Sequence, residues 1–155
     1  MSRSGADLAL LLLGSFRVLA DRAAVELAAH GYEDVRPVHD FALRAIMSGA
    51  NSASELGRRL AVTKQAAAKT LAVLEERRYV VREIDPTDKR RMRIRVTEHG
   101  LAMLRTGEAI FDDMRAQWEA DTGADTIAAV ERALRQLVGD NAIRVDSPHW
   151  NAQDL

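Results

Sequence analysis

Apolar side chains recur every three or four positions along most of the chain, the spacing that places them on one face of an α-helix. The first such segment covers residues 6–29, and Gly31 follows it as a C-terminal stop. A second segment begins at Pro37, where a first-turn proline is favoured, and ends near Ser48. The inner face of the first segment is formed by Leu8, Leu11, Leu12, Phe16, Leu19 and Leu27. We therefore predict two amphipathic helices at the start of the chain.

A short helix and a longer one are predicted next, separated by a tight turn. Ser52 and Glu55 have the spacing of a capping box, in which each side chain satisfies a free backbone amide near the helix start. Thr63 then offers an N-cap for a fourth helix that runs through Arg77. A short capped helix, a turn of about three residues and a longer helix are typical of a helix-turn-helix.

The fourth helix has an apolar face and a polar face. Ala67, Leu71 and Leu74 follow the spacing i, i+4, i+7 and are expected to face the core. The opposite side is formed by Lys64, Gln65, Ala68, Lys69 and Ala72. Small alanines allow a helix to approach a groove closely, and Lys and Gln side chains can reach phosphates and base edges. An ordinary solvated helix face has the same pattern, so this helix alone does not decide a function.

Two segments with strand character follow, joined by a turn. Residues 80–84 are rich in β-branched side chains, and residues 91–96 alternate strictly between arginine and an apolar residue. The inward positions predicted by this alternation are Met92, Ile94 and Val96, and the outward ones are Arg91, Arg93 and Arg95. Residues 85–90 contain Asp, Pro and Thr, which favour turns, and end in Lys-Arg. We predict a β-hairpin wing with a basic tip.

Two further helices are predicted after the hairpin. Thr97 can cap a fifth helix of about five to six turns. Either Asp121 or Thr122 can cap a sixth helix, which Gly139 ends. Residues 140–155 lack periodicity and are expected to form a tail or an added arm.

The net charge of −1 hides an uneven distribution along the chain. Residues 58–95 contain 12 Lys and Arg against 5 Asp and Glu, a net charge of +7, so the remainder carries −8. A basic module of this kind would present itself to a polyanion such as DNA. A scatter of solvated charges is the alternative.

Several classes of protein are disfavoured by the composition. The chain has no cysteine, which excludes disulfides, Cys-ligated zinc and thiol chemistry. No pair among the four histidines has metal-binding spacing and no glycine-rich phosphate loop occurs, so we expect no metal, no cofactor and no enzymatic activity. The longest early apolar run, residues 8–13, is too short to span a bilayer, and a cytoplasmic protein without a membrane partner is expected.

The motif Asp-Pro-Thr-Asp-Lys-Arg at residues 85–90, followed by Val-Thr-Glu-His-Gly at residues 96–100, resembles the MarR (multiple antibiotic resistance regulator) family. The Val-Thr-Lys-Gln segment at residues 62–65 supports the same resemblance, which extends roughly over residues 6–139. It implies a transcriptional regulator that works as a homodimer, in which the first, fifth and sixth helices of two protomers intertwine. A monomeric helical bundle is the structural alternative.

The fold class expected on all these grounds is mainly α, a winged helix-turn-helix of about six helices and a β-hairpin. Residues 1–139 would form a single domain, with a DNA-binding lobe over about residues 35–97. Dimerisation helices would cover about residues 6–30 and 98–139, because their apolar faces exceed what one small three-helix core can cover.

The resemblance also implies which residues contact double-stranded DNA. The fourth helix would enter the major groove, and Arg90 would enter the minor groove, oriented by a charge-assisted hydrogen bond from its side chain to Asp88. The implied DNA-binding residues are Ser54, Thr63, Lys64, Gln65, Lys69, Asp88, Lys89, Arg90 and Arg91. The alanines at 66–68 stand where relatives often carry Ser, Thr or Val, which limits direct base reading. Two DNA-binding lobes related by a two-fold axis predict an inverted-repeat operator.

Members of the family commonly bind a small aromatic or anionic effector between the dimer helices and the DNA-binding lobe. Arg17 and His39 lie on helices that would border such a cleft, although His39 can equally be a first-turn residue of the second helix. The expected function is a sequence-specific, ligand-responsive repressor. The alternative is a winged-helix adaptor for protein interactions without specific DNA binding, against which the outward arginines argue.

Overall fold

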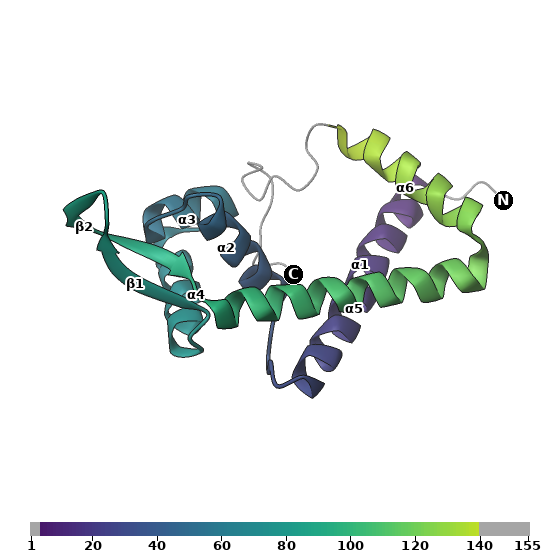
Figure 1. The fold of residues 1–155 in the computed structure, drawn as a ribbon. Helices are drawn as coiled ribbons and strands as arrows, with labels where there is room; N and C mark the ends of the chain where they lie inside the picture. Colours follow the sequence, from purple (N-terminus) through teal and green to yellow (C-terminus); the bar gives the residue numbers. More distant parts are fainter. Residues whose placement is uncertain (1–3, 140–155) are drawn as a thin grey trace.

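The structure of the chain, a computed structural model, describes residues 4–139. Within this range, six helices and a two-stranded antiparallel hairpin confirm the predicted winged helix-turn-helix. The elements are α1 (Gly5–Ala29), α2 (Pro37–Met47), α3 (Ala53–Leu60), α4 (Lys64–Glu76), β1 (Val80–Asp85), β2 (Asp88–Val96), α5 (Glu98–Thr122) and α6 (Ala124–Val138). Figure 1 shows an elongated molecule, in which the long α5 joins a lobe of α2, α3, α4 and the hairpin to α1 and α6.

The core of the lobe lies where α2, α3 and α4 meet the base of the hairpin. The leucines without exposed surface are Leu43, Leu56, Leu60, Leu71 and Leu74. Val80 of β1 and Ile94 of β2 belong to the same buried cluster. Each large apolar side chain contributes about 1.5–3 kcal/mol when it is fully buried, so this cluster is the main source of stability of the lobe. The predicted inner face of α4 is confirmed.

Thr97 and Gly100 fix the start of α5 on the base of the hairpin. Thr97 Oγ1 accepts the Gly100 N–H at 3.1 Å, which confirms the predicted cap, and it donates to the Arg78 carbonyl oxygen at 2.6 Å. A Cβ on Gly100 would overlap the carbonyl oxygen of Tyr79. Glycine is therefore required at this close approach, which sets the direction of α5 relative to the lobe.

The junction between α5 and α6 differs from the prediction. α5 runs for 25 residues, about seven turns rather than five to six. Neither Asp121 nor Thr122 caps α6, because Asp121 accepts from the Gln117 amide and Thr122 donates to the Trp118 carbonyl, both within α5. Gly123, with a φ of 96°, makes the turn instead. Side chains that bond back along their own helix are not available to cap the next one, and a positive φ favours glycine.

Only the C-terminal half of α1 is buried in this chain. Ala23 and Leu27 are buried, and α1 packs against α5, whereas Leu8 and Leu11 near the start of α1 are exposed. The predicted inner face of the first helix therefore lies partly on the surface of the chain. The larger exposed apolar side chains of α1, α5 and α6 include Leu8, Leu10, Leu11, Leu13, Val18, Val25, Phe111, Trp118, Leu134 and Leu137.

Membrane spans and metal sites were searched for in the described residues. No helix in residues 4–139 is long and apolar enough to cross a membrane. In the same range, no group of three or more His, Cys, Asp or Glu residues could hold a metal ion. The tail or arm predicted for residues 140–155 lies outside the described residues.

Candidate nucleic-acid interface

The helix-turn-helix consists of α3 and α4, and side chains cap both helices. Ser52 Oγ accepts the Glu55 N–H at 3.2 Å, and Thr63 Oγ1 accepts the Ala66 N–H at 3.1 Å, so both predicted N-caps are confirmed. The second half of the capping box is wrong, because the Glu55 carboxylate accepts the N–H of Asn51 at 2.9 Å rather than that of Ser52. These bonds pair backbone amides that the first turns would otherwise leave free.

A polar face of α4 is open to solvent. Lys64, Gln65 and Lys69 are exposed, opposite the buried Ala67 and Leu71. Neither lysine has a carboxylate within ion-pair distance in residues 4–139. The other predicted contact residues of the helix-turn-helix, Ser54 and Thr63, are also exposed. This face is therefore free to bind an external phosphate or base edge.

The hairpin has a regular stem and an irregular tip. The stem pairs residues 80–84 with residues 92–96 in antiparallel register, and the register then breaks, because Asp85 pairs with Asp88. The residues between these pairs on β2 are Lys89, Arg90 and Arg91, all of them exposed. The turn predicted over residues 85–90 is shorter than expected, since β1 ends at Asp85 and β2 begins at Asp88. The three consecutive cations therefore lie in the irregular part of β2.

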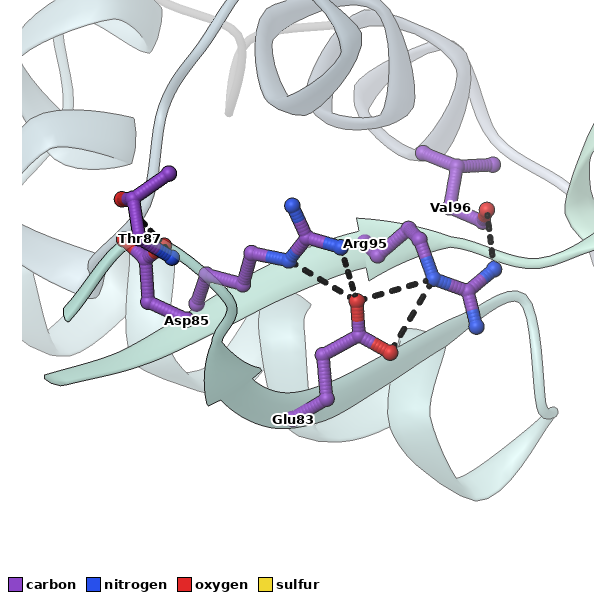
Figure 2. A network of polar contacts seen from close by, with 6 residues as sticks. Glu83, Asp85, Thr87, Arg95 and Val96 are labelled. Atoms are coloured by element: carbon purple, nitrogen blue, oxygen red, sulfur yellow. Dashed lines mark hydrogen bonds and ion pairs between the residues drawn. The ribbon is translucent and has the colours of Figure 1, made fainter. Parts of the chain in front are cut away.

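Two aspartates order this tip. Asp85 accepts hydrogen bonds from the hydroxyl of Thr87 at 2.7 Å and from its N–H at 2.8 Å, and these bonds lower the pKa of the Asp85 carboxyl (Figure 2). Asp88 accepts the backbone N–H of Arg90 at 3.0 Å and lies 3.7 Å from Arg91 Nε. The predicted bond from Asp88 to the Arg90 side chain is therefore wrong. Asp88 orients the backbone instead, and the Arg90 guanidinium has no ion-pair partner among the described residues.

The burial of the hairpin depends on the distance from the lobe. Ile94 and Val96 are buried as predicted, but Met92 is 58% exposed and its partner Ile84 is 60% exposed. The alternation does put Met92 on the same face as Ile94. At that point, however, the hairpin extends beyond the helices of the lobe (Figure 1), so the prediction that Met92 is covered is wrong.

Glu83 binds two arginines on the outer face of the hairpin, a contact that the sequence pattern does not reveal. Its carboxylate accepts hydrogen bonds from Arg93 Nε at 2.8 Å and from Arg95 Nε at 3.1 Å (Figure 2). The bond from Arg93, followed by that from Arg95, lowers the pKa of the Glu83 carboxyl. A correct strand register would have indicated this contact, because Glu83 and Arg93 are a cross-strand pair. Part of the positive charge of the basic segment is thus compensated internally.

Other arginines of residues 58–95 are also paired. Arg82 pairs with Glu75, and Arg77 Nη2 lies 3.3 Å from the Asp34 carboxylate. Within the described range, the cations of this segment without a carboxylate partner are Arg58, Arg59, Lys64, Lys69, Arg78, Lys89 and Arg90. Four of these seven lie on α4 or at the hairpin tip. Uncompensated positive charge is therefore concentrated on the two elements predicted to contact DNA.

An apolar pocket of about 100 Å³ lies between α1, α2 and α5. Its lining consists of Phe16, Ala20, Ala23, Ala24, Leu27, Val35, Arg36, Pro37, Asp40, Phe41, Met103, Gly107 and Phe111. The two predicted ligand-binding residues, Arg17 and His39, are absent from this lining.

His39 instead stabilises the first turn of α2. It is buried, and its Nδ1 accepts the backbone N–H of Arg36 at 3.0 Å. Burial, together with the nearby charges of Arg77 and Arg36, lowers the pKa of His39 to about 4. The imidazole is therefore neutral at physiological pH and serves as a hydrogen-bond acceptor. Arg17 is exposed on α1, and a ligand-binding role for these two residues stays a prediction.

The family model described as the MarR family matches residues 41–91, from α2 to the hairpin tip. This chain is therefore similar to the MarR family over that segment. Solved MarR-family structures share its fold over nearly the whole length of both chains. A variant of MepR from S. aureus bound to an oligodeoxyribonucleotide has a TM-score of 0.62 at 17% identity, covering 90% of this chain and 99% of that one.

Two further structures agree with this fold. A mutant MarR from E. coli has a TM-score of 0.65 at 21% identity, with 89% and 98% of the two chains covered. The YusO protein of Bacillus subtilis has a TM-score of 0.65 at 17% identity, with 89% and 99% covered. No curated protein matches the sequence. The chain therefore has the winged-helix fold of MarR-family transcriptional regulators.

Proposed function

We propose that the protein is a sequence-specific transcriptional regulator that binds double-stranded DNA as a homodimer. In this proposal α4 is the recognition helix and enters the major groove, while the hairpin tip enters the adjacent minor groove. The assigned contact residues are Ser54, Thr63, Lys64, Gln65, Lys69, Asp88, Lys89, Arg90 and Arg91. Asp88 acts indirectly, because it fixes the backbone at Arg90.

The location of uncompensated positive charge is the main support for this proposal. Arg93 and Arg95 are held by Glu83, whereas Lys64 and Arg90 have no carboxylate partner in the described chain. A free cation can neutralise a phosphate and release its counterion without breaking a contact within the protein. An oligodeoxyribonucleotide is bound to the MepR variant of the same fold, which agrees with this assignment.

The exposed apolar surface of the terminal helices supports a homodimer. Leu10 of α1 is 66% exposed and Leu137 of α6 is 71% exposed in a single protomer. An apolar surface of this kind marks an interface, and each large side chain that becomes fully buried contributes about 1.5–3 kcal/mol. A two-fold axis through these helices would present two recognition helices to an inverted repeat, with half-sites about one helical turn apart.

We further propose that the regulator is a repressor released by a small aromatic or anionic effector. The pocket between α1, α2 and α5 is largely apolar, which suits an aromatic ring, and it includes Arg36, whose exposed pair with Asp34 at 3.7 Å an anionic group would replace. Asp40 also lines the pocket, but its carboxylate is bound to Arg44 Nε at 2.7 Å and is therefore compensated. Acting on chromosomal DNA, the protein would work in the bacterial cytoplasm.

Selection of random duplex DNA by the immobilised protein tests the proposal. We expect enrichment of an inverted repeat, bound in a mobility-shift assay with an affinity that falls steeply with salt. Light scattering of the complex should give two protomers per operator. If no sequence is enriched above bulk DNA, the protein is not a specific regulator, and an interaction adaptor with a winged helix explains it better.

A further inference from the structure

The loop between α1 and α2 connects the apolar pocket to the end of α4. Val35 and Arg36 of this loop line the pocket, and Pro37 directly after them begins α2. Val35 is buried and belongs to the core cluster as well as to the pocket wall. A molecule that enters the pocket therefore acts directly on this loop.

Arg77 joins the same loop to α4. It is the C-cap residue of α4, and its Nη1 donates to the carbonyl oxygens of Glu33 at 3.0 Å and Asp34 at 2.9 Å. Its Nη2 donates to the Asp34 carboxylate at 3.3 Å. A planar guanidinium held at three points restricts the relative position of two elements more closely than a single ion pair does.

Asp34 has a backbone conformation that depends on its surroundings. Its φ is 52°, in the left-handed region that costs a residue other than glycine free energy. Arg77 bonds both the carbonyl oxygen and the carboxylate of Asp34, so it stabilises this conformation. Without the bonds from Arg77, the ion pair of the Asp34 carboxylate with Arg36 Nε at 3.7 Å remains, and it does not hold the Asp34 backbone. The coupling proposed below needs a second arrangement of the loop, in which Asp34 has a negative φ.

The aromatic contacts at this junction do not hold the backbone of residues 33–34. The ring centroid of Tyr32 lies 6.4 Å from that of Tyr79 and 5.6 Å from that of His99. Among the described residues, the side chains of these three rings form no hydrogen bond with the backbone of residues 33–34. Arg77 is therefore the side chain that links the backbone of the loop to α4.

We propose that Arg77 is a positioning residue that transmits the state of the apolar pocket to the recognition helix. An occupied pocket displaces Val35 and Arg36, Asp34 leaves the left-handed region, and the end of α4 is released. DNA affinity then falls, because the exposed side chains of α4 no longer keep their position relative to the hairpin tip. This inference rests on the proposed function and adds a route of regulation to it.

The pocket can be filled from within the protein, so the test needs no effector. Gly107 lines the pocket, and a Cβ there would meet no atom within 4 Å outside its own helical turn, so Gly107→Leu places an apolar side chain in the cavity. Affinity for a selected operator is measured for Gly107→Leu alone and combined with Arg77→Met. The matched control is Arg82→Met, which also removes one positive charge and breaks the ion pair between Arg82 on β1 and Glu75 on α4.

With Arg77 present, we expect Gly107→Leu to weaken operator binding at least about fivefold, the lower end of typical couplings between sites. Combined with Arg77→Met, the same substitution should change affinity less than about twofold, the usual limit of additive effects. Combined with Arg82→Met, it should keep its full effect. Equal effects in all three backgrounds overturn the proposal, and so does a Gly107→Leu protein that binds the operator like the wild type.

Two further measurements keep the test decisive. If Gly107→Leu does not fold, Ala24→Leu fills the same pocket from α1. Amide hydrogen exchange of α4 is measured in every variant, because it reports the coupling without DNA. A wild-type protein that selects no operator refutes the proposed function. In that case, the coupling is still supported if Gly107→Leu speeds amide exchange in α4 and if this increase disappears when Arg77→Met is added. The coupling is refuted if Gly107→Leu leaves the exchange of α4 unchanged.

Discussion

Replacement of Arg90 by alanine tests how charge is divided on the hairpin. Arg90 has no ion-pair partner in the described chain, whereas the Arg95 guanidinium is bound by Glu83 and by the Val96 carbonyl oxygen at 3.4 Å. A phosphate can pair with Arg90 without displacing an internal partner. We therefore expect Arg90→Ala to weaken operator binding, and to change its salt dependence, more than Arg95→Ala does.

The magnitude follows from the number of cations lost. Each neutralised phosphate contributes about −0.9 to the slope of log affinity against log salt concentration. A homodimer carries two copies of Arg90, so Arg90→Ala should reduce the slope by about 1.8. Between ~50 and ~200 mM salt, this difference in slope changes the ratio of the wild-type affinity to the Arg90→Ala affinity by about twelvefold. Arg95→Ala should give a much smaller change, because Glu83 already compensates that charge.

Fluorescence anisotropy of a labelled operator, titrated at several salt concentrations, measures both slopes. Light scattering should show that Arg90→Ala remains a dimer, because the hairpin tip is remote from α1 and α6 (Figure 1). Equal slope changes for Arg90→Ala and Arg95→Ala would refute the reasoning, because Arg95 would then neutralise a phosphate as well as Arg90 does despite its pairing with Glu83. An unchanged affinity of Arg90→Ala would refute the assignment of the tip to DNA.

Three further predictions concern stability and assembly. Gly100→Ala forces a Cβ against the Tyr79 carbonyl and should lower the free energy of unfolding by about 1–3 kcal/mol in urea titrations; a wild-type value would contradict this. The pKa of His39 is lowered from 6.5 to about 4, so the neutral imidazole adds stability that is complete above pH 6.5 and is lost as the pH falls towards 4. Over this range the free energy of unfolding of the wild type should fall by about 3 kcal/mol more than that of His39→Gln. Parallel pH profiles of the two proteins would contradict the lowered pKa. Leu137→Glu should give monomers in light scattering while the far-ultraviolet spectrum stays helical; a surviving dimer would remove Leu137 from the interface.

The helices and the hairpin could be predicted because the signals that define them are local. Ser52, Thr63 and Thr97 each cap a helix by bonding an amide three residues further along the chain. The α5–α6 junction was not predictable in the same way. Asp121 and Thr122 are both suitable caps by type, and only their bonds within α5 show that neither is used.

The candidate site was predictable by residue type but not in its internal contacts. The exposed cations of α4 follow from helical periodicity, and those of the hairpin tip follow from the turn-forming residues beside them. The exposure of Met92 depends on how far the hairpin extends beyond the lobe, which no local pattern encodes. The bond between Arg77 and the Asp34 carbonyl joins residues 43 positions apart, and a single sequence carries no signal for such a pair.

The register break in the hairpin has a consequence for the evolution of binding preference. Residues 80–84 and 92–96 keep their own pairing, and Ile94 and Val96 anchor that stem in the core. No residue of the segment 85–91 belongs to the buried cluster, so we expect it to tolerate changes in length or sequence without disturbing the packing beneath it. If the tip enters the minor groove as proposed, a chimera that received this segment from another protein should acquire the donor's minor-groove preference on an unaltered scaffold. Under the proposed function, changes in this one short segment would be enough to alter the preferred operator.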